Sequence, residues 1–321
     1  MPTGSIHRMS RPSIAAPTVE CAPNVSEGRE HRVIERLADA IRSVDGVTLM
    51  NVHADVDHHR TVFSFLGEGA RVEAAALALA ARAVELIDLR RHRGIHPRVG
   101  ALDVLPFVPL AGISMAETIA LARRVGEAIA RRHALPVYYY GEAATRPGRR
   151  TPRALRQGEY EGLAARLASA GGAPDAGPAR FDPRTGAVLV GARDILVAFN
   201  VWLATGEVAV AREIARTVRE SSGGLPAVQA MGVLLASRGI AQVSMNLLDY
   251  RTTSIAVAFD RVRDEARTRG VAVSRSELVG VAPRAAFAGR APESVGLAAF
   301  TPELYLDTYL DSGAAPLRSG A

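Results

Sequence analysis

Two histidines, His92 and His96, stand four residues apart in the arginine-rich stretch 88-DLRRHRGIHPRVGALDVLPF-107. On a helix this spacing would place both imidazoles on one face, as a metal-binding pair requires. Gly94 lies between them, however, and Pro97 disfavours helical backbone angles at the residue before it. The spacing therefore predicts that His96 lies in a loop, where its imidazole could act as an acid or base near neutral pH.

The other histidines cluster in the same part of the chain, since five of the eight lie between residues 53 and 96. The sequence contains no HExxH motif and only one cysteine, Cys21, which excludes an internal disulfide and a cysteine-rich metal site. The pattern favours acid–base use of an imidazole over a metal site, and we expect no metal. A structural, hydrogen-bonded side chain is the alternative for each histidine taken singly.

The composition is that of a globular protein, with 321 residues, 48% hydrophobic and 22% charged. All 39 basic positions are arginine, and the formal net charge is +6. Because guanidinium groups pair with carboxylate or phosphate, the arginines indicate an anionic ligand, with genome composition as the alternative. The arginines are spread along the chain and aromatic residues make up only 5%, so we expect no nucleic-acid partner.

The chain has no segment typical of export or of a membrane span. Its most apolar run, 74-AAALALAARAVELI-87, carries Arg82 and Glu85, and the N-terminal residues are polar. We therefore expect a cytoplasmic protein that does not enter a membrane. Residues 1–16 and 312–321 are expected to be disordered tails.

Apolar periodicity predicts the order β-α-β-β-α-β in the first half, followed by one more helix and strand. The predicted strands lie near 17–22, 47–54, 60–67, 101–108 and 136–140, and the helices lie at 29–44, 71–91 and around Leu121, Val125 and Ile129. The sequence from 169 to 186 is rich in Gly, Pro and Ala, as in a linker or a long ordered loop.

The same order of elements returns after this loop. It comprises strands at 194–201, 227–235, 241–248 and 271–279, and helices at 206–220 and 255–268. Strand alternation also gives each half one polar face. The polar positions are Asn51, His53 and Asp55 in the first half, and Gln242, Ser244 and Asn246 in the second. These faces are either solvated or line a cleft between two lobes.

Several long runs resemble the glutamate formimidoyltransferase family, in the order in which the family has them. They are 20-ECAPNVSEGRE-30, 59-HRTVFSFLG-67, 91-RHRGIHPRVGALDVLPFVPL-110, 137-VYYYGEAA-144, 157-QGEYEGL-163, 175-DAGPARFDPRTGAVLVGARDILVAFN-200 and 241-AQVSMNLLDY-250. The resemblance extends over residues 19 to 311. It implies transfer of a formimidoyl group between N-formimidoyl-L-glutamate and tetrahydrofolate in histidine breakdown, with tetrahydrofolate as a co-substrate.

The resemblance also implies a fold. This is an α+β fold of two ferredoxin-like (split β-α-β) subdomains that face each other across a folate-binding tunnel, in a homodimer. We expect the N-terminal subdomain at 17–176 and the C-terminal subdomain at 177–311. Vertebrate members continue into a cyclodeaminase domain, which we do not expect in this chain.

By resemblance, the catalytic residue is His96, the histidine of the G-x-H-P-R motif, and the other histidines are expected to matter less. The segment that resembles the family's folate-binding stretch comprises Gly177, Pro178, Ala179, Arg180, Phe181, Asp182, Pro183, Arg184, Thr185 and Gly186. Ile95 replaces an acid of the vertebrate pattern, and His53 and Asp55 stand where that pattern has Asp and Gly. Folate-dependent transfer to another amine, and a non-catalytic folate-binding protein, are the alternatives.

This role for His96 has a physical reason. When an amidine carbon passes between two nitrogens, the attacking amine must lose a proton and the departing nitrogen must gain one, and one imidazole can do both in turn. Arg91, Arg93 and Arg98 could hold the carboxylates of glutamate or of the folate tail.

Overall fold

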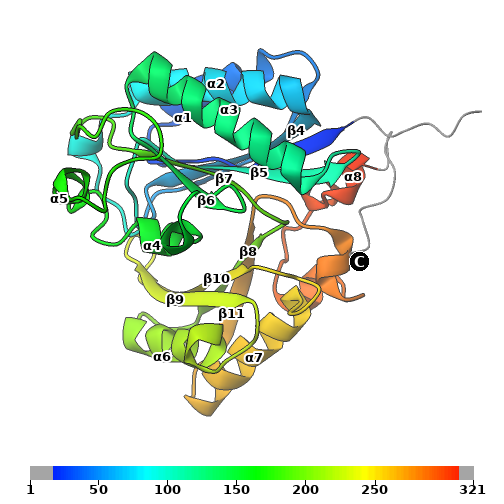
Figure 1. Cartoon of the computed structure of the whole chain (residues 1–321). Helices are drawn as coiled ribbons and strands as arrows, with labels where there is room; N and C mark the ends of the chain where they lie inside the picture. The colour runs from blue at the N-terminus through cyan, green and yellow to red at the C-terminus, as the bar shows by residue number, and fades with distance from the viewer. Residues whose placement is uncertain (1–16, 311–321) are drawn as a thin grey trace, which may run out of the picture.

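The computed structural model describes residues 17–310, so the tails expected at 1–16 and 312–321 lie outside it. Figure 1 shows four stacked layers, in which two sheets face each other between two outer layers of helices. The first lobe comprises β1 to β7 and α1 to α5, and the second lobe comprises β8 to β11 with α6 and α7. The expected α+β class with two sheets is thereby confirmed.

The first sheet runs in the order β3-β4-(β1, β2)-β5-β7-β6, antiparallel as far as β5 and parallel from β5 to β6. Its strands are β1 (Thr18–Cys21), β2 (Asn24–Val25), β3 (Val47–Asp55), β4 (Arg60–Glu68), β5 (Leu102–Ala111), β6 (Val137–Gly141) and β7 (Val188–Ala192). The helices on its outer face are α1 (His31–Arg42), α2 (Gly69–Leu86) and α3 (Met115–His133). These helices pack on the sheet because each carries an apolar stripe, such as Leu37 and Ile41 of α1, both fully buried.

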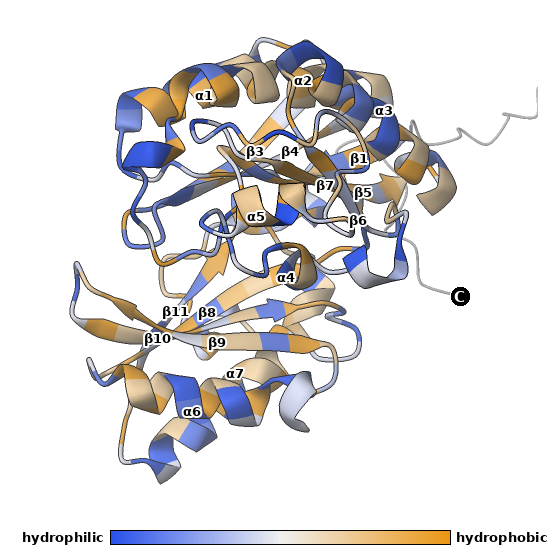
Figure 2. Cartoon of the chain, turned by 60° about the vertical axis from the view of Figure 1, so that its left-hand side comes forward, coloured by the Kyte–Doolittle hydropathy of each residue, from blue (hydrophilic) through white to orange (hydrophobic). Residues whose placement is uncertain are grey.

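Two short helices, α4 (Pro152–Leu155) and α5 (Leu163–Ala168), lie on the other side of the first sheet. Figures 1 and 2 both draw α4 between this sheet and the second lobe. Its neighbours include a small apolar cluster with Tyr138, Tyr140 and Leu189. The segment from α4 onward therefore covers part of the sheet face that looks towards the second lobe.

The second sheet is antiparallel throughout, in the order β11-β8-β10-β9. Its elements are β8 (Val197–Leu203), α6 (Val208–Val218), β9 (Val228–Leu235), β10 (Ile240–Leu247), α7 (Ile255–Thr268) and β11 (Val273–Val279). Helices α6 and α7 cover its outer face, and the final helix, α8 (Asp307–Leu310), returns to the first lobe beside β4 and β5. No helix within residues 17–310 is both long enough and apolar enough to cross a membrane.

The structure differs from the predicted elements at three places. Helix α2 ends at Leu86, because Ile87 has extended backbone angles, and a short 3-10 helix, η1, follows at Leu89–Arg91. Strand β7 and helices α4 and α5 were not predicted. All five residues of β7 are buried between β5 and β6, so the strand lacks the alternation that marks a half-exposed strand. It belongs to the first sheet although it follows residue 176, where the sequence placed the subdomain boundary.

The polar faces of the two sheets look towards each other. His53 Nε2 of β3 lies 3.6 Å from Glu277 Oε1 of β11, and Glu277 Oε2 accepts hydrogen bonds from Asn200 and Gln242 of the second sheet. Strict alternation with Asn51, His53 and Asp55 on the polar face would place Met50 on the opposite, helix-covered face of β3. Met50 packs in a cluster with residues of the C-terminal segment instead, because the strand register shifts between Leu49 and Asn51.

Candidate functional site

His96 lies in the loop formed by residues 92–98, and this loop rests directly on the turn between β3 and β4. The amide of Ile95 donates a hydrogen bond to the carbonyl oxygen of Asp57, 3.0 Å away. A Cβ atom at Gly94 would lie 2.3 Å from the carbonyl oxygen of His58 and 2.6 Å from Cβ of His59. Only glycine allows this close approach, and the predicted loop at His96 is confirmed.

A pair of stacked histidines fastens the loop to the turn. The rings of His59 and His92 are 4.2 Å apart and nearly parallel, and His92 Nε2 donates to the carbonyl oxygen of His59 at 2.7 Å. His59 Nε2 lies 3.3 Å from Glu27, and burial lowers the pKa of His92 to about 4. These two imidazoles are therefore structural. Within residues 17–310, no group of three or more His, Cys, Asp or Glu side chains is arranged to hold a metal ion.

The ring of His96 is half-buried and faces an environment of positive charge. Its centroid is 6.4 Å from that of His58, and no described residue hydrogen-bonds to its nitrogens. Burial lowers the pKa of His96 well below its ordinary value, and the charges of Arg60 and Arg156 lower it further. His96 is consequently a neutral imidazole at physiological pH, with a free lone pair for accepting a proton.

The two arginines are held in place by polar side chains of the first lobe. Arg60 Nη1 donates to Asn24 Oδ1 at 2.8 Å, and burial lowers the pKa of Arg60 to about 10. Arg156 pairs with the buried carboxylate of Asp103, whose other oxygen accepts the amide of Val99 at 2.7 Å. The buried Nε atoms of both arginines have no hydrogen-bond partner among the described residues.

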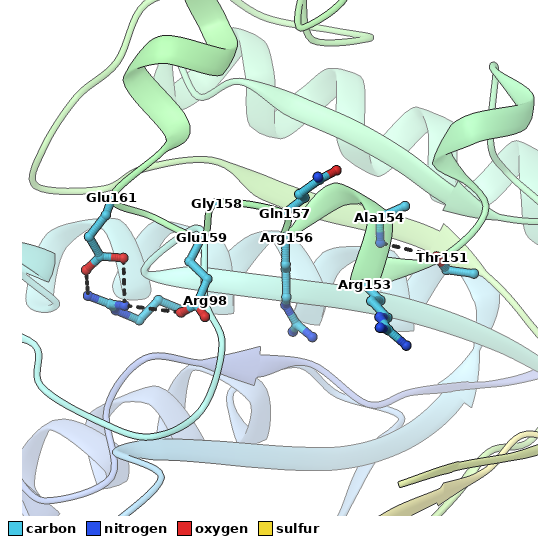
Figure 3. A pocket seen from close by; sticks show the side chains of 9 residues that line it. All are labelled: Arg98, Thr151, Arg153, Ala154, Arg156, Gln157, Gly158, Glu159 and Glu161. Atoms are coloured by element: carbon cyan, nitrogen blue, oxygen red, sulfur yellow. Dashed lines mark hydrogen bonds and ion pairs between the residues drawn. The ribbon is translucent and has the colours of Figure 1, made fainter. Parts of the chain in front are cut away.

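A cavity of about 950 Å³ opens beside α4 and contains the Arg156 side chain. Its lining is drawn in Figure 3 and comprises Arg98, Thr151, Arg153, Ala154, Arg156, Gln157, Gly158, Glu159 and Glu161. The guanidinium groups of Arg153 and Arg156 point to the same side, away from the helix. His96 is not among the lining residues, but Arg156, which lines the cavity, is one of the charges that lower the pKa of His96.

The segment Gly177–Gly186 contributes none of the nine residues that line this cavity. Its ends turn sharply, with φ of 82° at Gly177 and 67° at Gly186. The ring of Phe181 packs 5.5 Å from that of Tyr160, and the guanidinium of Arg98 lies 5.2 Å above the Tyr160 ring. Tyr160 therefore connects the segment to the cavity wall.

The arginines next to His96 in sequence have separate contacts. Arg98 Nη2 donates to Glu161 Oε1 at 2.8 Å, and Arg93 Nη1 donates to the carbonyl oxygen of His92 at 2.7 Å. Arg91 is exposed. Arg60 and Arg156, which act on His96, were not singled out from the sequence. The nearest signals were two runs quoted for the family resemblance, since 59-HRTVFSFLG-67 contains Arg60 and 157-QGEYEGL-163 directly follows Arg156.

The structure combines two facing sheets with an arginine-lined cavity and a neutral imidazole. This combination is typical of an α+β enzyme that binds an anionic small molecule. Residues 18–193 match the N-terminal subdomain of the formiminotransferase domain, and residues 198–292 match the formiminotransferase domain. The chain belongs to the formiminotransferase family.

The relatives agree with this assignment. The chain is 41% identical to glutamate formimidoyltransferase of Streptococcus pyogenes serotype M1, over 84% of this chain and 90% of that protein. It is also 41% identical to glutamate formimidoyltransferase of Thermoplasma acidophilum, over 84% and 89%. The formimidoyltransferase-cyclodeaminase of Rattus norvegicus is 43% identical over 83% of this chain, which matches 50% of that longer protein.

Gly94→Ala tests the contact between the loop and the turn. The added methyl group would overlap the backbone of His58, so we expect a loss of about 1 to 3 kcal/mol in unfolding free energy, measured by denaturant titration. Gly148→Ala is the control, because a Cβ at that position meets nothing within 4 Å. Equal stability of the two variants would contradict the close packing described here.

Arg156→Gln tests the electrostatic control of His96. Removing a neighbouring positive charge should raise the pKa of His96, because the imidazolium is no longer repelled by it. NMR titration of the histidine rings measures this, with the His96 signal assigned by its absence from His96→Ala. Arg131→Gln, at an exposed site on α3, should leave the titration unchanged. An unshifted His96 in Arg156→Gln would contradict the assigned cause.

Proposed function

We propose that this chain is a glutamate formimidoyltransferase. It transfers a formimidoyl group between N-formimidoyl-L-glutamate and tetrahydrofolate, with 5-formimidoyltetrahydrofolate and L-glutamate as products, in histidine degradation and one-carbon metabolism. The observation that carries this proposal is the 41% identity to two enzymes of that name, over about nine tenths of each. The described residues must then supply a folate site and an acid–base group.

The cavity beside α4 suits a folate in size and in charge. Its volume of about 950 Å³ is in the range of small-molecule sites. Arg153 and Arg156 offer guanidinium groups to the carboxylates of a folate tail. The rings of Tyr160 and Phe181 lie next to each other, tilted by 52°, and either ring offers an aromatic face for a ligand ring to contact.

The segment Gly177–Gly186 supports this site. The side chain of Arg184 donates to the carbonyl oxygen of Glu85, and the amide of Leu89 donates to the carbonyl oxygen of Arg184 at 3.0 Å. Tyr160 donates to the carbonyl oxygen of Pro183 at 2.6 Å. The segment therefore positions the Tyr160 and Phe181 rings beside the arginines, which is the folate-binding role that we propose for it.

In the reaction, the bound folate supplies the secondary amine that accepts the one-carbon unit. His96 is the acid–base group of the protein. Its neutral ring accepts the proton that the attacking amine must lose. The positive charges of Arg60 and Arg156 keep the imidazole unprotonated before each turnover and attract the carboxylates of both substrates.

We further propose that each lobe contains a ferredoxin-like (split β-α-β) unit and that the lobes enclose a folate-binding tunnel. The order β11-β8-β10-β9 supports the first point, because it is the order of strands 4-1-3-2 of a split β-α-β unit. The facing polar surfaces at His53 and Glu277 support the second. In this proposal the chain passes from the first lobe to the second between residues 193 and 198. We also propose that the protein is a homodimer in the cytoplasm.

Transfer to an amine other than glutamate is the second candidate function. The observation that favours it is the pair of His53 and Glu277, which places an imidazole and a carboxylate where the two sheets meet. A glutamate carboxylate would be repelled by Glu277 unless His53 or Arg60 compensates it. An assay with N-formimidoyl derivatives of glutamate, aspartate and glycine, each with tetrahydrofolate, compares these donors by their kcat/KM and so identifies the amino acid that the site prefers.

Folinic acid should stabilise the protein against heat. A ligand that binds only the folded state adds RT ln(1 + [L]/Kd), or about 2.7 kcal/mol at a hundredfold excess over Kd. We expect a rise in Tm of several degrees, measured by scanning calorimetry, and a smaller rise in Tyr160→Ala, because that variant loses one of the two rings. ATP serves as the control ligand. A rise with ATP and none with folinic acid would refute a folate site.

His96→Ala should lower kcat roughly 10²- to 10⁴-fold while the folate-induced shift in Tm remains, because the substitution removes a proton acceptor and leaves the cavity intact. His92→Ala is the matched control, since its ring is engaged by a backbone carbonyl. Its kcat should fall less. Steady-state kinetics with N-formimidoyl-L-glutamate and tetrahydrofolate measure both. A fully active His96→Ala would remove this residue from the mechanism.

A further inference from the structure

The cluster of five histidines in the first lobe leaves two rings available for proton transfer. His59 and His92 are engaged in fastening the loop to the turn, and His53 faces Glu277 of the second lobe. His96 is free, as described above. His58 uses one ring nitrogen, and its Nε2 has no hydrogen-bond partner within residues 17–310.

A buried carboxylate fixes the orientation of His58. Asp55 Oδ1 accepts a hydrogen bond from the backbone amide of His58 at 2.7 Å and lies 3.0 Å from Nδ1 of the same ring. Burial acts to raise the pKa of Asp55, but these hydrogen bonds and the nearby charges lower it, so Asp55 is a carboxylate. Nδ1 is consequently the donor to Asp55, and Nε2 is the nitrogen that His58 presents to its surroundings.

The dyad of Asp55 and His58 stands beside His96. The ring centroids of His58 and His96 are 6.4 Å apart, and the ring planes are tilted by 53°. The distance is set by Gly94, which brings the His96 loop against the backbone of His58. Two imidazoles with this separation can contact two different nitrogens bonded to one carbon atom between them.

We propose that His58, oriented by Asp55, is the second acid–base group of the transfer, and that it protonates the departing nitrogen while His96 deprotonates the attacking nitrogen. This inference rests on the proposed function. One carbon–nitrogen bond forms as His96 takes a proton, and one carbon–nitrogen bond breaks as His58 gives a proton. No net proton is consumed, and the proton on His96 returns to His58 through solvent before the next turnover.

The surroundings of the two rings match these opposite roles. Arg60 and Arg156 oppose a positive charge on His96, which keeps the ring unprotonated before the attack although it weakens the ring as a base. Asp55 Oδ1 lies 3.0 Å from Nδ1 of His58, which leaves Nε2 of that ring to face the reacting nitrogen. The other charged or titratable groups near the dyad are Asp57 in the same turn, His53 on β3, and Arg238 of the second lobe, 3.6 Å from Asp55. From the sequence, His58 was expected to matter less than His96.

His58→Gln tests this assignment, because glutamine can keep a hydrogen bond to Asp55 but cannot transfer a proton. In the unmodified enzyme, kcat should follow a bell-shaped pH profile, because the transfer needs one unprotonated and one protonated group. We expect His58→Gln to lower kcat roughly 10²-fold and to abolish the alkaline limb. The shift in Tm caused by folinic acid should be unchanged.

Asp55→Asn is the second variant, and its kcat should fall while the folinic-acid shift in Tm is unchanged, because His58 loses the carboxylate that orients its ring. His92→Gln is the control and should retain both limbs. An alkaline limb that persists in His58→Gln, or a kcat within about twofold of the unmodified enzyme, overturns the inference. Absence of transfer by the unmodified chain would overturn the proposed function as well, so the two failures are distinguishable.

Discussion

The buried carboxylate of Asp55 is the constraint on which the arrangement of the site depends. An ionised carboxylate that is only 5% exposed costs several kcal/mol unless charged or hydrogen-bonding groups surround it. Its partners come from the β3–β4 turn, through His58, and from the second lobe, through Arg238. Ser237, next to Arg238, also donates to Asp57 at 2.6 Å. The Asp55 carboxylate, which orients the His58 imidazole, thus also takes part in a contact between the two lobes.

Apolar periodicity predicted most of the fold, because a helix or strand that buries only one face shows that burial as a regular repeat of apolar residues in its sequence. Helix α7 was predicted with its observed bounds, Ile255–Thr268, and β9 and β10 came within one residue of theirs. The failures occur where a strand departs from regular polar–apolar alternation. Burial on both faces removes the alternation of β7, and the register shift at Met50 breaks the alternation of β3. A shift of this kind depends on the neighbouring strand, which the sequence of β3 does not describe.

The candidate site was less predictable, because it is assembled from contacts between distant segments. The loop at His96 followed from Gly94 and Pro97, and its role followed from family resemblance. The arginines that act on it, Arg60 and Arg156, lie 36 and 60 positions away, so a list of arginines near His96 in sequence could not find them. Asp55 and His58 had a local signal, a carboxylate three residues before an imidazole at the end of a strand, but only the turn brings them beside His96.

The polar atoms that lack partners add a second line of argument about the space between the sheets. Among the described residues, Asn51 Oδ1 of β3, Gln242 Oε1 of β10 and Trp202 Nε1 of β8 are buried without a hydrogen bond. Each costs about 1 to 3 kcal/mol, and a stable fold does not retain such costs at random. Trp202 also lies between the guanidinium groups of Arg238 and Arg275, 4.9 and 3.6 Å from its ring. These donors and acceptors occur on strands of both lobes, so the polar character of the facing surfaces is shared by the two sheets.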